Sequence, residues 1–282
     1  MNSTIDLHMH SSFSDGSETP EELLASLQRS GIRTFSLTDH DTIAGSLALG
    51  AIVPPNVRFF YGVEFSCRTE AGKCHILGYC YDPDSEALQQ CLTHGADIRK
   101  ARLRDRLAFL QARYSIMLPA EETEQLAAHP CAGKPHIAAL LVKHGFVPDI
   151  STAMQTYLKD IPASIDRLPA QEAVSAILAA GGTPVWAHPL GGEGEAHSTP
   201  KQFARQLAIL LHAGIQGLEC FYSRYTQEEA DFLCSAAAQH RLLISGGSDY
   251  HGANKKIPLG TLSADGIAVS PEQLTILKTF SV

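Results

Sequence analysis

The hydrophobic and polar positions near the start of the chain change from one period to another. Apolar and polar residues alternate over residues 5–10, which predicts a strand with His8 and His10 on one face. Residues 17–31 have helical spacing, begin with a capping-box pattern and end at a glycine. A second strand is predicted over residues 32–37, and such a β-α-β unit indicates parallel strands.

The alternation of strands and helices resumes later in the chain. Strands are predicted over residues 58–63, 74–79, 183–187, 215–220 and 242–245, and helices over residues 171–180, 200–213 and 227–239. This order is typical of α/β folds, and of (β/α) barrels above all. In such barrels the carboxyl ends of the strands converge on the face that carries the chemistry.

Between residues 83 and 162 the alternation stops and the pattern becomes helical. One long helix is predicted over residues 85–113, and shorter helices over residues 120–158. We therefore expect a helical insertion at residues 83–162, a lid or substrate subdomain, within a barrel formed by residues 1–82 and 163–282.

Composition narrows the class of protein. The chain has 282 residues, of which 44% are hydrophobic, and this excludes a disordered chain. Its net charge of −8 argues against binding to extended duplex nucleic acid. The seven cysteines are odd in number and form no C-x-x-C pair, as expected of reduced thiols. The sequence shows neither a signal-peptide pattern nor a membrane-spanning apolar run, so we expect a cytoplasmic protein with no membrane partner.

Histidines and acidic residues recur beside the predicted strands. Nine of them form one candidate set: His8, His10, Asp15, His40, Glu64, His75, His188, Asp249 and His251. Burial of several unrelated carboxylates without partners would be strongly unfavourable, so a shared metal site explains the set better. Nine ligands exceed the needs of one tetrahedral zinc, and mixed nitrogen and oxygen ligands indicate two or three ions with Glu64 as a bridge. Such a cluster suits phosphate chemistry, because the ions activate water and neutralise phosphoryl oxygens.

Six short motifs carry a family resemblance. They are Asp6–Ser11 (DLHMHS), Thr38–Thr42 (TDHDT), Gly62–Glu64 (GVE), the single His75, Ala187–Pro189 (AHP) and Gly247–His251 (GSDYH). In this order they resemble the PHP (polymerase and histidinol phosphatase) family of metal-dependent phosphoesterases. The resemblance implies an α/β fold, a distorted (β/α)7 TIM-like barrel, with two or three divalent ions, manganese first and iron or zinc as alternatives.

The resemblance also implies a role for each candidate ligand. One ion would be held by His8, His10, Glu64 and Asp249, a second by Glu64, His75 and His188, and a third by Asp15, His40 and His251. Within these sets the catalytic residues would be His188, His251 and Asp249. Glu219 also lies near a strand end, but we expect it to be structural.

Two further segments bear on the substrate. Gly133–Ala138 (GKPHIA) and Phe221–Thr226 (FYSRYT) resemble the stand-alone branch of the family that acts on nucleoside 3',5'-bisphosphates and RNA 5' ends. The residues expected to bind substrate are Lys134, His136, Arg224 and Arg102, the last from a run of five basic residues. Position 134 is often Arg in that branch, and Lys lacks its planar fork. The alternative is that these side chains are surface charges.

The leading hypothesis is a phosphomonoesterase that acts on nucleoside 3',5'-bisphosphates and releases phosphate and a nucleoside monophosphate, with 5'-to-3' trimming of short RNA as an extension of this activity. Its partner would be a small phosphorylated nucleotide or short RNA. A histidinol-phosphate or other small-molecule phosphatase is an alternative that needs no nucleobase pocket. A non-catalytic, metal-bearing scaffold domain is a second alternative. The sequence leaves open the metal, the base preference and the oligomeric state.

Overall fold

A computed structural model describes residues 3–129, 131–159, 161 and 167–280. Its sheet runs in the order β1-β2-β3-β4-β6-β7-β8, and a short strand β5 pairs with the outer part of β3. The strands are β1 (Ile5–Asp6), β2 (Thr34–Leu37), β3 (Arg58–Thr69), β4 (Gly72–Tyr79), β5 (Leu168–Pro169), β6 (Thr183–Ala187), β7 (Gly217–Tyr222) and β8 (Leu243–Gly247).

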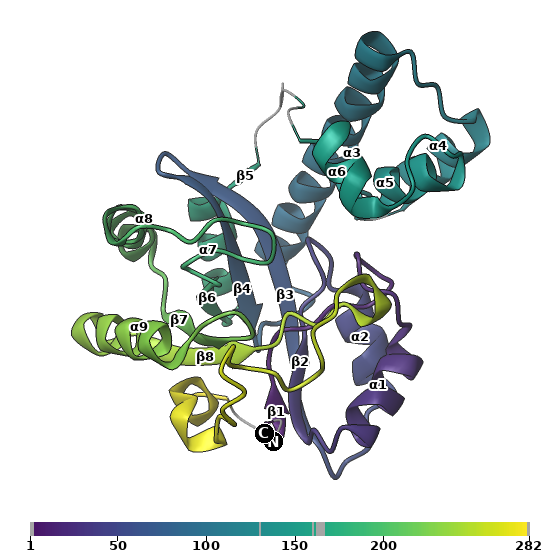
Figure 1. Ribbon diagram of the computed structural model, residues 1–282. Coiled ribbons are helices and arrows are strands. Elements are labelled where there is room, and N and C mark those ends of the chain that lie inside the picture. Colours follow the sequence, from purple (N-terminus) through teal and green to yellow (C-terminus); the bar gives the residue numbers. More distant parts are fainter. Residues whose placement is uncertain (1–2, 130, 160, 162–166, 281–282) are drawn as a thin grey trace.

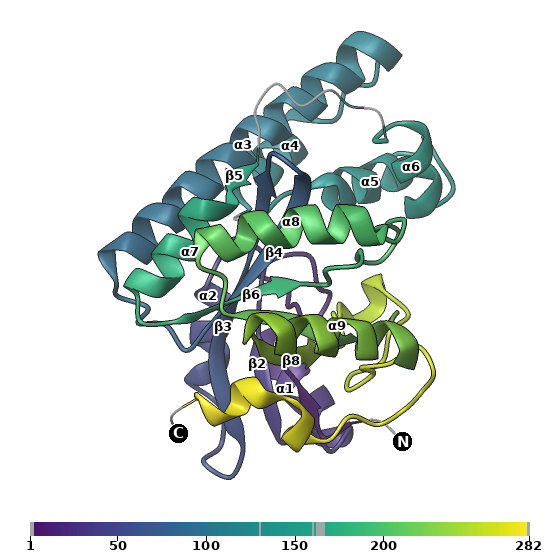
Figure 2. The ribbon, with the colours of Figure 1, turned by 90° about the vertical axis from the view of Figure 1, so that its left-hand side faces the viewer.

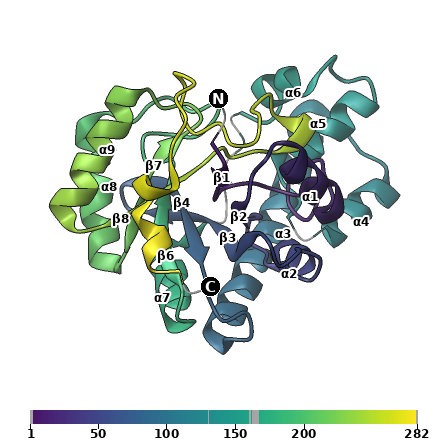
Figure 3. The ribbon, with the colours of Figure 1, turned by 90° about the horizontal axis from the view of Figure 1, so that it is seen from below.

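The sheet curls into a nearly closed barrel (Figure 3). Where β8 returns to the first strand, the Leu7 amide donates to the Gly246 carbonyl at 3.2 Å and the Asp249 amide to the His8 carbonyl at 2.8 Å. β1 itself ends at Asp6, earlier than predicted, because beyond it only isolated pairing joins the chain to its neighbours. The predicted distorted, TIM-like α/β barrel is confirmed.

Helices cover the outside of the barrel, with α7, α8 and α9 along one side (Figure 2). The helices are α1 (Pro20–Arg29), α2 (Ala44–Gly50), α3 (Glu86–Tyr114), α4 (Ala120–Ala128), α5 (Lys134–Lys143), α6 (Ile150–Thr156), α7 (Ala170–Ala179), α8 (Pro200–Ala213) and α9 (Gln227–His240). Three short 3-10 turns follow: η1 (Gly252–Asn254), η2 (Pro271–Gln273) and η3 (Thr275–Lys278). None of the helices in the described ranges combines the length and apolar character needed to cross a membrane.

The local signals that begin α1 are those expected from the sequence. The Thr19 side chain accepts from the Glu22 amide at 3.3 Å, and the Glu22 carboxylate accepts from the Thr19 amide at 2.9 Å. Pro20 occupies the first helical turn, where its missing N–H has no partner to lose. Helix α2 was not predicted, because its short run of small residues (AGSLALG) has no amphipathic period.

Strands β1 and β2 are parallel, as the first β-α-β unit indicates, but strand β4 runs antiparallel to both of its neighbours, β3 and β6. β3 continues past its predicted end to Thr69, and only Glu70 and Ala71 separate it from β4. A two-residue link can join only antiparallel strands, because a parallel crossover needs a dozen or more residues. Because β4 runs in the opposite direction, the first half of this strand, which contains His75, lies at the end of the barrel where the parallel strands end.

The first half of α3 packs against the barrel core, whereas its second half and helices α4 to α6 lie together beside the open end of the barrel (Figure 1). They enclose a hydrophobic cluster of their own, which includes Leu103, Leu110, Ile137 and Leu141. The division into a barrel and an insertion at residues 83–162 stays a prediction. The predicted return to the barrel at residue 163 lies outside the described residues.

Candidate metal centre

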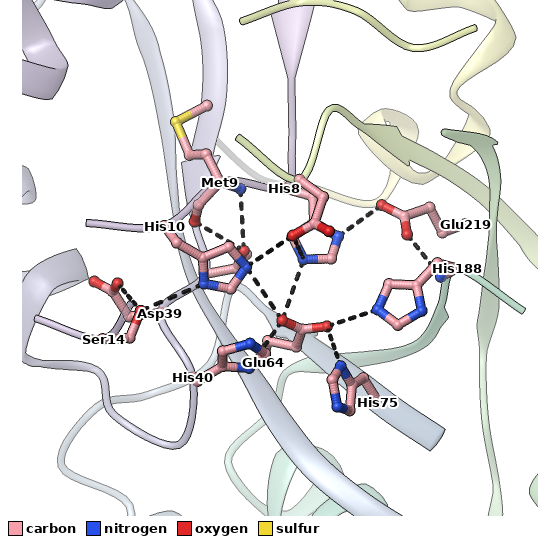
Figure 4. A network of polar contacts seen from close by, with 12 residues as sticks. His8, Met9, His10, Ser14, Asp39, His40, Glu64, His75, His188 and Glu219 are labelled. Atoms are coloured by element: carbon pink, nitrogen blue, oxygen red, sulfur yellow. Dashed lines mark hydrogen bonds and ion pairs between the residues drawn. The ribbon is translucent and has the colours of Figure 1, made fainter. Parts of the chain in front are cut away.

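Glu64 lies at the centre of a ring of imidazoles (Figure 4). It comes from the middle of β3, and its side chain is 1% exposed. Its Oε2 atom is 3.3 Å from His8 Nε2, 3.2 Å from His10 Nε2 and 3.0 Å from His40 Nδ1. His8 and His10 point in the same direction, as the alternation at the start of the chain predicts.

The other oxygen of Glu64 faces two more histidines. Its Oε1 atom is 2.9 Å from His75 Nδ1 on β4 and 3.1 Å from His188 Nε2, which follows β6. One carboxylate thus meets five imidazoles from four parts of the chain. If all five rings were protonated they would repel one another at close range, so the arrangement is better suited to cations that the carboxylate bridges.

Among the residues that the structure describes, three groups of side chains have ligand atoms within 4.8 Å of one another. They are His8, His10, Glu64 and Asp249; His10, Asp15, His40 and His251; and His40, Glu64 and His75. The first group has the same members as the first predicted set, and the second adds His10 to the predicted Asp15 set. The third pairs Glu64 and His75 with His40, where the prediction has His188. All nine predicted ligands nevertheless lie in or directly beside the cluster.

The chemistry of the cluster fits divalent ions. Within the described part of the chain, His8 Nε2, His10 Nε2 and His40 Nδ1 are buried atoms without a hydrogen-bond partner. Burial lowers the pKa of His40 to about 3, so this ring keeps the neutral form that binds metal. Burial disfavours the charged form of Glu64, but the other imidazoles around it, His8 among them, hold its pKa well below the ordinary value. A bridging carboxylate with unpaired imidazole nitrogens around it is a donor set for manganese, iron or zinc.

Buried carboxylates behind the cluster orient its imidazoles. Glu219 on β7 accepts from His8 Nδ1 at 2.9 Å and from the His188 amide at 2.7 Å. With its Nδ1 proton committed to Glu219, His8 directs the lone pair of Nε2 toward Glu64. Asp39 accepts from the Ser14 hydroxyl at 2.6 Å and so holds the loop that presents Asp15. Glu219 lies outside the three groups above, which agrees with its predicted structural role.

The backbone is strained at the same place. His188 and Asp249 have positive φ angles of 30° and 59°, and Asp41, next to His40, has a φ of 51°. Such conformations are unfavourable for residues with a Cβ and persist where the surroundings enforce them, which is common at functional sites. The strained positions follow strands β2, β6 and β8, where the chain turns to aim a side chain at the cluster.

A cavity of about 360 Å³ lies between the β3–β4 hairpin and the insertion. We call it the basic pocket. Its lining residues are Arg68, Gly72, Lys73, Arg102, Asp105, Arg106, Lys134, Lys159, Ile161 and Arg167. Seven cationic side chains thus share the pocket with one carboxylate, in a chain of net charge −8. Burial and neighbouring cations lower the pKa of Lys134 to about 8 and that of Arg106 to about 10. Like charges held together in this way favour an anionic ligand.

The basic pocket borders the candidate metal centre. Arg167 Nη1 lies 3.3 Å from His75 Nε2. In the antiparallel β3–β4 pair, Arg68 is opposite Lys73 and Ser66 is opposite His75. Since side chains alternate along a strand, Glu64, Arg68, Lys73 and His75 share the inner face of the hairpin.

The predicted substrate-binding residues are divided among three places. Lys134 and Arg102 line the basic pocket. His136 instead packs against His129, at 4.5 Å between ring centroids, and its Nδ1 accepts from the Gly133 amide. Arg224 donates to the carbonyl of Gly192 and, at 3.4 Å, to that of Glu195, so its guanidinium holds the loop after β6. Substrate contact by these residues stays a prediction.

Three cations that the barrel contributes to the basic pocket were not predicted from the sequence. Arg68 and Lys73 reach it only because the hairpin is antiparallel, and Arg167 only because the chain returns beside β3. In the sequence, polar residues of a strand that forms a pocket beyond the sheet look the same as polar residues of a strand end that is exposed to solvent. Alternation beyond Glu64, with Ser66 and Arg68 at every second position, was the available signal.

Three relatives resemble this chain over most of its length. A phosphoribosyl 1,2-cyclic phosphate 1,2-diphosphodiesterase from Eggerthella lenta is 31% identical and covers 90% of this chain and 96% of its own. A 3',5'-nucleoside bisphosphate phosphatase from Chromobacterium violaceum is 31% identical, with 88% and 87% covered. A 5'-3' exoribonuclease from Haemophilus influenzae is 30% identical, with 92% and 94% covered.

Solved structures and a family model agree with these relatives. A protein from Bifidobacterium adolescentis, assigned as a metal-dependent phosphoesterase, superposes with a TM-score of 0.78 at 27% identity over 93% of both chains. An amidohydrolase from Chromobacterium violaceum, solved with bound sulfate and no metal, has a TM-score of 0.77 at 28% identity, over 91% of this chain and 90% of its own. The model for the PHP domain matches residues 6–161, more than half of the sequence. The chain belongs to the PHP domain family.

Proposed function

We propose that this member of a family of metal-dependent phosphoesterases hydrolyses a phosphomonoester of nucleoside 3',5'-bisphosphates, releasing phosphate and a nucleoside monophosphate. Short RNA with a 5' phosphate, trimmed from 5' to 3', is a related substrate. The partner is thus a small phosphorylated nucleotide rather than a membrane or an extended duplex. The observation that carries the proposal is that one inner face bears the metal cluster and, directly beside it, the basic pocket.

The hairpin sets the spacing between the two. His75 belongs to the metal cluster and Lys73, two residues away on the same strand face, lines the basic pocket. Two strand residues span about 7 Å. A molecule with two phosphate groups can therefore place one at the cluster and the other among the cations, whereas a simple monophosphate leaves the pocket without its anion.

The side chains divide the work accordingly. Divalent ions in the cluster, manganese first and iron or zinc as alternatives, would lower the pKa of a bound water and offset charge on the scissile phosphoryl group. His188, Asp249 and His251 follow β6 and β8 and hold the reacting face of the cluster. Lys134 and Arg102 bind the phosphate that is not cleaved through charge-assisted hydrogen bonds.

Relatives support this substrate class without selecting one member of it. The three named above act, by name, on a nucleoside bisphosphate, on RNA and on a cyclic phosphate of phosphoribose. All three substrates carry phosphate on a ribose. Histidinol phosphate would use the same cluster but has no second phosphate for the basic pocket. A non-catalytic scaffold would have no need for nine converging ligands.

The decisive experiment is a phosphate-release screen of the purified protein with manganese present. It compares a nucleoside 3',5'-bisphosphate, the corresponding monophosphates, a cyclic ribose phosphate, histidinol phosphate and a short 5'-phosphorylated RNA. We expect the bisphosphate to give the highest kcat/KM, and elemental analysis to find more than one equivalent of transition metal per chain. Higher kcat/KM on histidinol phosphate would reject the substrate, and one equivalent of metal or less would reject the cluster.

A further inference from the structure

Asp249 presents its two carboxylate oxygens to different surroundings. Oδ1 faces the cluster, 3.2 Å from His10 Nε2 and 3.6 Å from His8 Nε2. Oδ2 faces away from these rings and accepts from the Tyr222 hydroxyl at 2.9 Å and from Lys255 Nζ at 2.8 Å. The carboxylate is thus held so that one oxygen is available to an ion while the other is occupied by two donors.

We propose that Lys255 is a positioning residue of the metal centre, which acts together with Tyr222 to fix the carboxylate of Asp249. This inference rests on the proposed function, because it takes Asp249 to be a metal ligand. Lys255 follows η1, six residues after Asp249, and nothing in the motifs of the sequence points to it. Its role is to hold a ligand in one orientation.

The environment of Lys255 explains how a cation is tolerated so close to a metal site. Its side chain is 21% exposed, and besides Asp249 it faces the carboxylate of Glu193, with Oε2 at 3.8 Å from Nζ. Asp15 adds a third negative charge on the same side. Burial lowers the pKa of Lys255, but Asp249 and these carboxylates outweigh it and keep the ammonium charged.

A positioning role is distinct from substrate binding. The ammonium of Lys255 is already at hydrogen-bond distance from Asp249, whereas the substrate has the cations of the basic pocket. Loss of Lys255 should therefore free the Asp249 carboxylate to rotate and weaken metal retention. Partners that orient metal ligands typically change metal affinity or activity by about 10- to 100-fold.

The test compares Lys255→Met, Lys255→Arg and Tyr222→Phe with wild type, and uses Lys256→Met as the matched control because Lys256 is the exposed neighbour. For each protein we would measure thermal unfolding, metal per chain after dialysis against a weak chelator, the manganese concentration at half-maximal activity, kcat and KM. We expect Lys255→Met to need about 10- to 100-fold more manganese with KM within about twofold of wild type. Lys255→Arg should recover most of the loss, Tyr222→Phe should show a smaller loss, and Lys256→Met should match wild type.

Two results would overturn the inference while leaving the metal centre intact. An unchanged manganese requirement in folded Lys255→Met would show that Asp249 needs no such support. A raised KM with unchanged metal content would place Lys255 on the substrate. A wild-type protein that binds no divalent metal would instead reject the proposed function, and the inference with it. If Lys255→Met fails to fold, Tyr222→Phe still tests the inference, because it removes only the hydroxyl that donates to Asp249.

Discussion

The metal cluster and the basic pocket lie side by side but are built in opposite ways. The cluster is buried, and its side chains are fixed by other residues, as Glu219 and Asp39 show. The basic pocket is a half-open cavity in which cations from the hairpin and the insertion crowd together. In the first region protein carboxylates hold the functional side chains in place, whereas in the second the cations lower one another's pKa and favour an anionic ligand. Under the proposed function, the barrel would carry out the reaction, and the hairpin and insertion would select the substrate.

The largest effect should follow from removing the centre of the cluster. Glu64→Gln keeps the shape of the side chain but removes the charge that five imidazoles face. We expect metal content to fall below one equivalent and kcat to drop at least about 1,000-fold, or roughly 4 kcal/mol in barrier terms. Elemental analysis and steady-state kinetics measure both.

Thermal unfolding of the metal-free proteins provides the control for Glu64→Gln. The barrel has its own hydrophobic core, so we expect the variant to remain folded. Retention of more than about a tenth of the wild-type rate, a loss under about 1.4 kcal/mol, would show that Glu64 does not bridge catalytic ions.

The second effect is smaller and selective for substrate. Lys134→Ala should lower kcat/KM for a 3',5'-bisphosphate by about 10- to 150-fold, because a charged hydrogen bond contributes roughly 1.5 to 3 kcal/mol. A simple monophosphate should be hydrolysed almost as before. Arg104→Ala is the matched control, since Arg104 lies on the exposed face of the nearby helix α3. Equal losses on both substrates would show that Lys134 contacts the scissile phosphate. The cluster and the basic pocket would then not have separate roles in reaction and substrate choice.

The two regions also differ in how far the sequence predicted them. Most of the cluster follows from strand ends, because histidines and acids that repeat after buried parallel strands converge in a barrel. Glu64 and His75 are the exceptions, since they lie within β3 and the antiparallel strand β4. In the basic pocket, Lys134 and Arg102 were predicted from the sequence. Lys73 was not, because its place depends on the direction of β4, and Arg167 was not, because its place depends on the pairing of β5 with β3. Period and spacing report local structure and cannot report which distant segments meet.

The third effect depends on pH. Burial and neighbouring cations lower the pKa of Lys134 to about 8, so the side chain is charged below pH 8 and loses its proton above it. For the bisphosphate, kcat/KM should therefore fall as pH rises through 8, since this ratio reports the free enzyme. Lys134→Arg should lose that decline, because a guanidinium stays charged. A profile shared by both proteins would assign the decline to another group.

The smallest effect should come from Arg224, which the sequence associates with substrate and the structure places on backbone carbonyls. Its guanidinium donates to the carbonyls of Gly192 and Glu195, within the loop that follows His188. Arg224→Ala should therefore loosen this loop, make it more sensitive to limited proteolysis, and change kcat/KM by less than about fivefold, or roughly 1 kcal/mol. The change should be equal for bisphosphate and monophosphate, because a loosened loop affects His188 and leaves the basic pocket intact. A loss of about 10-fold or more that is confined to the bisphosphate would show that Arg224 contacts the substrate. The residues that select the substrate would then include the loop after β6 as well as the basic pocket.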